Sequence, residues 1–125
     1  MKEIGVGILG FGTVGAGVAA GLLKNRATLS QRLGADVVLR KIADLDITTD
    51  RGVKIPAGIL STDAMAVIHD PSVQIIVELI GGTGIAKKFI LEAIASGKCV
   101  VTANKRLLAE SGKEIFEAAG KAGVD

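Results

Sequence analysis

The stretch Gly10-Phe11-Gly12-Thr13-Val14-Gly15 is the clearest candidate for chemistry, because it sets three glycines between an apolar run and a helix-forming segment. Gly10 permits a tight turn, Gly12 lets the backbone approach a diphosphate, and Gly15 lets the helix lie close to the strand. Amides at the start of such a helix face an anion, which the helix dipole favours. The strand, turn and helix together predict dinucleotide binding, with an ordinary glycine turn as the alternative.

An acid follows the second expected strand, residues 37–43. In a mononucleotide-binding unit, the acid at this place takes the ribose hydroxyls, which makes Asp44 the candidate. It lies further along than the usual spacing of about twenty residues, so the first helix or its loop must be long. Asp46 is a second candidate, and a solvated loop acid is the alternative for both. Arg51 and Lys54 could reach a 2′-phosphate or could simply be solvated.

A second glycine turn, Gly81-Gly82-Thr83-Gly84, follows the third expected strand, residues 73–80. It lies at the carboxyl end of that strand, the side on which open α/β sheets bind ligands. Glu78 interrupts the apolar run. A buried carboxylate without partners is costly, so Glu78 needs donors or a cation nearby. Two interpretations stay open: it braces the amides of this loop, or it lies at a solvated strand end.

Asn104 and Lys105 follow the fourth expected strand, residues 99–102. Asn104 is expected to cap a short helix over 105–109, and a lysine in the first turn of that helix opposes its dipole. A negatively charged ligand or an acid in the crevice would compensate. The residues from Ser111 to Glu114 form a capping box that predicts a second, separate helix start.

These turns must be positioned by the strands and helices around them. Strands are expected over 4–9, 37–43, 73–80 and 99–102, and helices over 13–25, 63–69, 85–96, 105–109 and from 111 onward. Residues 28–34 extend the first helix or form a turn, 47–60 are irregular, and the last two residues resemble the start of a strand. Ser61 or Thr62 is the expected N-cap of 63–69, and Thr83 that of 85–96. The alternation predicts an α/β fold, a Rossmann-like, doubly wound, mostly parallel sheet with helices on both faces.

The composition excludes several classes of protein. A chain of 125 residues fits one domain, and a net charge of +2 without charge blocks indicates no nucleic-acid or membrane partner. The absence of Trp and Tyr argues against base stacking. Residues 4–23 carry no charge, but their glycines weaken the continuous helix that a membrane span needs. The single cysteine, Cys99, fits a small core residue in a cytoplasmic, reducing location, and His69 fits a structural role.

With these pieces in place, the sequence resembles the N-terminal NAD(P)-binding domain of homoserine dehydrogenase over its whole length, chiefly through residues 5–15, 77–83 and 101–109. The resemblance implies NADP or NAD as cofactor. It also implies interconversion of L-aspartate 4-semialdehyde and L-homoserine, on the route to threonine, methionine and isoleucine. By the same resemblance, residues 11–14 contact the cofactor phosphates. The path to the nicotinamide is lined by Ile80, Gly81 and Gly82. Lys105 is the expected catalytic residue, acting in proton transfer or charge stabilisation.

The resemblance also has limits. Residues 1–125 match only the cofactor-binding domain, so we expect a fragment that is inactive alone, whose full-length form is a homo-oligomer with an amino-acid substrate. Leu45 stands where NADP-preferring members often carry Arg, so a 2′-phosphate would have to be held by Arg40, Lys41, Arg51 or Lys54. The rival hypothesis is a non-enzymatic NAD(P)-binding regulatory module.

Overall fold

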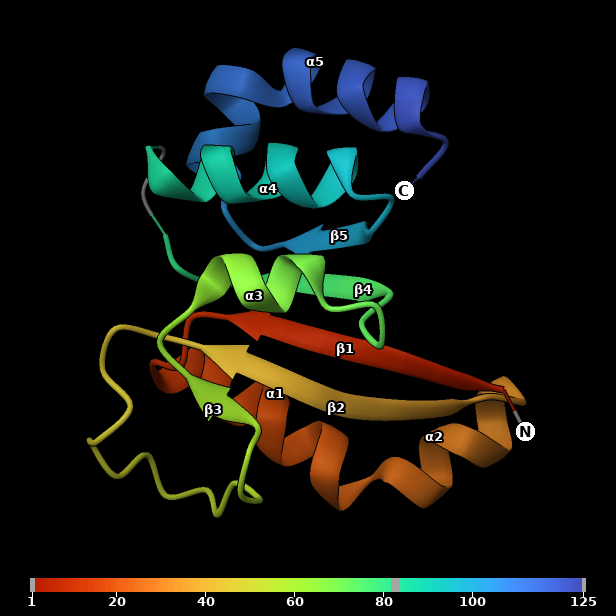
Figure 1. Cartoon of the computed structure of the whole chain (residues 1–125), viewed down its shortest axis with the longest axis vertical. Coiled ribbons are helices and arrows are strands. Elements are labelled where there is room, and N and C mark those ends of the chain that lie inside the picture. Colours follow the sequence, from red (N-terminus) through yellow and green to blue (C-terminus); the bar gives the residue numbers. More distant parts are fainter. Residues whose placement is uncertain (1, 82–83, 125) are drawn as a thin grey trace.

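A computed structural model describes residues 2–81 and 84–124, which form a parallel sheet with helices on both faces (Figure 1). The strands are β1 Glu3–Leu9, β2 Asp36–Ala43, β3 Leu60–Ser61, β4 Ile75–Glu78 and β5 Cys99–Thr102. The helices are α1 Thr13–Lys24, α2 Arg26–Leu33, α3 Ala64–His69, α4 Ile85–Ala95 and α5 Lys105–Ala122. The strand order is β3-β2-β1-β4-β5, with each neighbouring pair parallel. The predicted doubly wound fold is confirmed.

The strand order reverses at β1, and the register brings the carboxyl ends of its neighbours level with its own. Leu9 pairs with Ala43 on one side and with Glu78 on the other, and Glu78 pairs in turn with Thr102. The loops after these four residues therefore leave the sheet at one edge, toward which the arrows of β1 and β2 point in Figure 1. In open α/β sheets this edge, beside the strand where the order reverses, is where ligands bind.

Helices cover the two faces because neighbouring residues of a strand point to opposite sides. Ile8 packs with Phe11 and Ala16 in the core under α1, whereas Leu9 packs with Val67 and Ala93 under α3 and α4. A third cluster joins α5 to α4, and its buried members are Ala86, Ile90, Ile94, Leu107 and Ile115. In Figure 1, α1 and α2 lie below the sheet and α4 and α5 above it. None of the helices in the described residues has both the length and the apolarity to cross a bilayer.

The predicted break in the last helix is wrong. Asn104 caps α5 as expected, since its Oδ1 accepts from the Leu107 amide at 3.0 Å, but the helix then runs without interruption to Ala122. The Ser111–Glu114 capping box lies inside it. Leu107 and Ile115 are both buried against α4, and this packing requires one continuous helix through the region. Tertiary burial overrides the local capping signal.

Several other predicted caps and strand ends differ from those in the structure. The N-cap of α3 is Asp63, whose Oδ1 accepts from the Ala66 amide, and not Ser61 or Thr62. Ser61 instead pairs in β3, a strand absent from the prediction. The third predicted strand, 73–80, is paired only over Ile75–Glu78, and Cys99 is half-buried rather than buried. The cap predicted at Thr83 lies outside the described residues, as does Asp125.

The segment left open at 28–34 is helical as far as Leu33. Asn25 separates α1 from α2, and the C-cap of α2 is Gly34 in the left-handed conformation, with φ of 67°. Arg26 holds this helix to the start of β2, since its Nε and Nη2 donate to the two oxygens of Asp36 at 2.8 and 2.6 Å. The hydrogen bonds from Arg26 lower the pKa of the Asp36 carboxyl to about 2.

The turn between β1 and α1 requires glycine at two places. Gly10 has a φ of 106°, and a Cβ there would lie 2.8 Å from the Leu79 carbonyl carbon. A Cβ at Gly15 would lie 2.0 Å from the Gly10 carbonyl oxygen. Both roles predicted for these glycines are confirmed, because each lets one backbone segment lie against another.

We predict that Gly15→Ala destabilises the chain by about 1–3 kcal/mol or more, because the added methyl meets rigid backbone. Gly17→Ala is the matched control two residues further along α1, where a Cβ would meet nothing within 4 Å. It should be neutral or stabilise by up to about 1 kcal/mol through helix propensity. Urea unfolding of the two variants provides the measurement. Equal stability of both would contradict the close approach of α1 to the Gly10 carbonyl.

Candidate functional site

Two cavities lie at the carboxyl edge of the sheet, on either side of the start of α1. The larger, of about 680 Å³, lies between the ends of β1 and β2 and the starts of α3 and α4, and its walls include Asp44, Leu45 and Phe89. The smaller, of about 300 Å³, is lined by residues after β4 and β5, among them Gly81 and Lys105. Leu79 lines both cavities. Gly10 and Gly12 line the larger cavity and Val14 lines the smaller, so we call the two cavities, together with the start of α1 between them, the groove.

The start of α1 lies between these ends and is suited to an anion. The first hydrogen bond of the helix runs from the Ala16 amide to the Gly12 carbonyl, so the amides of residues 13–15 have no acceptor within the helix. A Cβ on Gly12 would meet no atom within 4 Å, so there is open space beside this backbone. Unbonded amides, a helix dipole and space beside the chain are what a diphosphate needs.

Asp44 holds the glycine turn against β2. Its Oδ2 accepts from the Phe11 amide at 2.5 Å and its Oδ1 accepts from the Asp46 amide at 2.8 Å. The Phe11 side chain is only 3% exposed and lies in the core under α1. A carboxylate oxygen can accept more than one hydrogen bond, so Asp44 keeps capacity for a ligand on the wall of the larger cavity.

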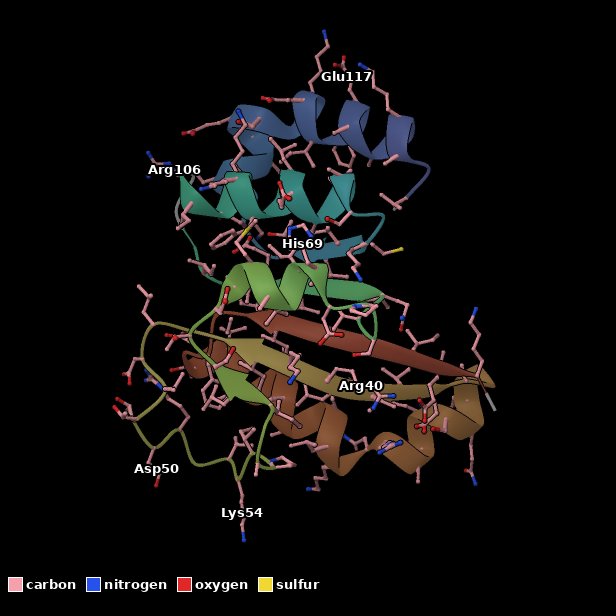
Figure 2. All side chains as sticks on the ribbon, viewed as in Figure 1. Arg40, Asp50, Lys54, His69, Arg106 and Glu117 are labelled. Carbon is pink, nitrogen blue, oxygen red and sulfur yellow. The ribbon has the colours of Figure 1, made fainter. Side chains whose placement is uncertain are left out.

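The second candidate acid, Asp46, organises its own loop. It accepts hydrogen bonds from the amides and hydroxyls of Thr48 and Thr49, and these bonds, the Thr49 hydroxyl first, hold its pKa well below the usual range. Arg51 forms an ion pair with it at 3.4 Å. Lys54 is exposed and points away from the rest of the molecule in Figure 2.

The two cations on β2 are also engaged elsewhere. Arg40 pairs with Glu3 at the amino end of β1, 2.5 Å from Nη2 to Oε2, and Lys41 donates to the Gly58 carbonyl at 2.9 Å. Neither interaction lies at the carboxyl edge. Of the four cations considered for a 2′-phosphate, Arg51 is the one whose partner, Asp46, directly follows the residues that wall the larger cavity.

Glu78 is fully buried at the end of β4 and braces the loop that follows. Its Oε2 accepts from the amides of Ile80 at 2.7 Å and Gly81 at 3.3 Å. Its Oε1 accepts from the Thr102 hydroxyl at 2.7 Å. The first of the two interpretations of Glu78 is confirmed. Its partner Thr102 was missed, because nothing local in the sequence marks a threonine at a strand end as a carboxylate partner.

Lys105 begins α5 and lines the smaller cavity. Its side chain forms no ion pair within the described part of the chain, although it occupies the positive end of a helix. A cation in this position is electrostatically unfavourable until an anion or an electron-rich group lies near it. The structure therefore brings Lys105 to the same edge as the glycine turn, Asp44, Ile80 and Gly81; Gly82 lies outside the described residues.

His69 lies away from this edge, between α3 and α4 (Figure 2). Its Nε2 is 3.0 Å from Glu92 Oε1, and its Nδ1 is 3.2 Å from the Ser96 hydroxyl. These contacts join the two helices and support the structural interpretation. Among residues 2–81 and 84–124, no group of three or more His, Cys, Asp or Glu side chains is arranged to hold a metal ion.

Comparison with known proteins identifies relatives over the entire chain. Residues 10–125 match the family described as homoserine dehydrogenase, NAD binding domain. The homoserine dehydrogenase of Neisseria gonorrhoeae is 44% identical over 124 residues, which cover 99% of this chain and 28% of that protein. That of Bacillus subtilis is 39% identical over 125 residues, covering 100% of this chain and 29% of the relative. This chain thus spans less than a third of the relatives that it matches.

Solved structures of homoserine dehydrogenases superpose on this chain over nearly its whole length. The crystal structure of a homoserine dehydrogenase from Thiobacillus denitrificans superposes with a TM-score of 0.89 at 40% identity, covering 98% of this chain and 28% of that one. The S. aureus homoserine dehydrogenase at pH 7.5 superposes with a TM-score of 0.90 at 34% identity, covering 98% of this chain and 32% of that one.

We predict that Asp44→Asn destabilises the chain by about 1–3 kcal/mol. An amide side chain has one oxygen, so either the Phe11 or the Asp46 amide loses its acceptor. Asp50→Asn is the matched control, because Asp50 accepts a single backbone bond, from Gly52, that the asparagine oxygen can still take. Denaturant unfolding of both variants tests this. Equal losses would show that Asp44 does not hold the turn.

Proposed function

We propose that this chain, which belongs to the homoserine dehydrogenase family as its NAD-binding domain, is the cofactor-binding part of a longer enzyme that interconverts L-aspartate 4-semialdehyde and L-homoserine. The observation that carries the proposal is the groove at the carboxyl edge, where the glycine turn and Lys105 lie at the ends of strands held in one register. The length of the chain relative to its relatives supports a further, substrate-holding part.

In the proposed binding mode, the dinucleotide runs from the larger cavity, past the glycine turn, to the smaller cavity. The adenosine half fits the larger cavity, with Asp44 beside the ribose hydroxyls and Leu45 and Phe89 beside the base. The diphosphate fits the open space at Gly12, against the amides of residues 13–15. The nicotinamide half fits the smaller cavity, next to Gly81 and Lys105.

The choice between NAD and NADP rests on the wall of the larger cavity. Asp44 favours a ribose with free hydroxyls, because it can accept from them. Leu45, which is 94% exposed, offers no charge for a 2′-phosphate. A 2′-phosphate would have to draw Arg51 away from Asp46. Either cofactor is compatible with the other contacts of the groove.

Lys105 is the proposed catalytic residue of this domain. When bound, the cofactor supplies hydride exchange at its nicotinamide ring. Lys105 lines the smaller cavity, and in the proposed mechanism its ammonium stabilises negative charge on the substrate oxygen or hands it a proton. Lys105 is exposed, so the alternative is a solvated surface cation; its place at the positive end of α5 favours a nearby anion instead.

The proposal also covers the substrate, the oligomeric state and the location of the full-length enzyme. Its small-molecule partner would be an amino-acid substrate, held by residues outside this chain. We also propose a homo-oligomer in the full-length form and a cytoplasmic location. A non-enzymatic NAD(P)-binding module would share the groove, but its relatives would not be expected to be dehydrogenases throughout, as those described above are.

We predict that Lys105→Ala in the full-length enzyme lowers kcat by about 10²–10⁴-fold while the chain still folds and binds NADH. The matched control is Arg106→Ala, one residue later, whose side chain is 78% exposed and pairs with Glu110 within α5 (Figure 2). Its kcat should change by no more than about twofold. Steady-state kinetics with homoserine and NAD or NADP provides the measurement. Equal kcat for Lys105→Ala and wild type would remove Lys105 from the mechanism.

A further inference from the structure

We propose that Glu78 and Thr102 form a positioning pair that fixes the nicotinamide end of the groove, by tying the loop after β4 to the start of α5. This inference rests on the proposed function, because it concerns how one end of the cofactor is held. Neither residue is proposed to react. Each acts through the backbone that it holds.

The pair forms one continuous chain of hydrogen bonds across the end of the sheet. On one side, Glu78 Oε2 accepts from the amides of Ile80 and Gly81. On the other, Glu78 Oε1 accepts from the Thr102 hydroxyl, whose oxygen in turn accepts from the Asn104 amide at 3.0 Å. The hydroxyl donates once and accepts once, so its orientation is fixed. Two loops that are far apart in the sequence are thereby held by one carboxylate.

The burial of Glu78 indicates that this arrangement serves the loops rather than the core. Glu78 is 0% exposed, and its neighbours in the sheet are Leu9 and Thr102. Burying a carboxylate is costly unless it is well hydrogen-bonded, and an apolar residue would pack at this position without that cost. An apolar residue would, however, leave the Ile80 and Gly81 amides and the Thr102 hydroxyl without their acceptor. The carboxylate therefore sets the path of the backbone around the smaller cavity.

The Thr102 side of the pair acts on one end of the groove. Glu78, Gly81, Asn104 and Lys105 all line the smaller cavity. Ile80, whose amide Glu78 also holds, lines the larger cavity, but neither Glu78 nor Thr102 does. Because Asn104 caps α5, holding its amide also holds the first turn, from which Lys105 projects. Loss of the Thr102 hydroxyl should therefore disturb the nicotinamide half and leave the adenosine half intact.

The test compares two ligands that differ in the nicotinamide. NADH spans the whole groove, whereas ADP-ribose lacks the ring that would enter the smaller cavity. Thr102→Val removes the hydroxyl at nearly constant shape, and Thr102→Ser keeps it. We expect Thr102→Val to weaken NADH binding about tenfold, with ADP-ribose affinity unchanged within about twofold, because the loss is confined to one end. Thr102→Ser should bind both ligands as wild type does.

Calorimetry gives both affinities, and the fluorescence of the reduced nicotinamide ring of NADH gives a second readout of its surroundings. Equal weakening of both ligands would show a general structural role and overturn the inference. Unchanged NADH binding in Thr102→Val, or equal affinity of the wild type for the two ligands, would also overturn it. A wild-type chain that binds neither ligand would instead contradict the proposed function.

Discussion

The structure depends on one constraint, the parallel register that sets the carboxyl ends of four strands in a row. Leu9 pairs with Ala43 and with Glu78, and Glu78 pairs with Thr102. Each of these residues is followed by a loop that reaches the groove. A shift of one residue in any pairing would turn that strand's apolar side chains to the wrong face and displace its loop. The apolar packing of the two faces therefore also fixes the geometry of the site.

Two carboxylates hold the loops that follow these strand ends in fixed positions. Asp44 holds the first glycine turn through the Phe11 amide, and Glu78 holds the second through the Ile80 and Gly81 amides. Both act on backbone amides, which loops leave without partners unless a side chain or water supplies one. The groove between them is left with the amides at the start of α1 and the Lys105 ammonium, which are the groups suited to a charged ligand.

The sequence predicted the strands, the glycine turns and the edge at which they meet, because apolar periodicity and glycine carry strong local signals. It did not predict β3, since a strand of two residues, Leu60–Ser61, leaves no pattern. It placed a helix start at Ser111, because a local capping box cannot reveal that Leu107 and Ile115 are buried on one helix. The sequence also did not identify Thr102 as the hydrogen-bond donor to Glu78, because only the register between β4 and β5 brings the two residues together.

One dinucleotide is proposed to contact all of these loops at once. The most direct test is to follow the backbone amide resonances of the ¹⁵N-labelled chain by NMR as NADH is added. The account predicts shifts at residues 13–15, at Gly81 and at Lys105 together, with no shifts in α2, which is tied to the amino end of β2. Shifts confined to one side of the glycine turn, or centred on α2, would contradict it.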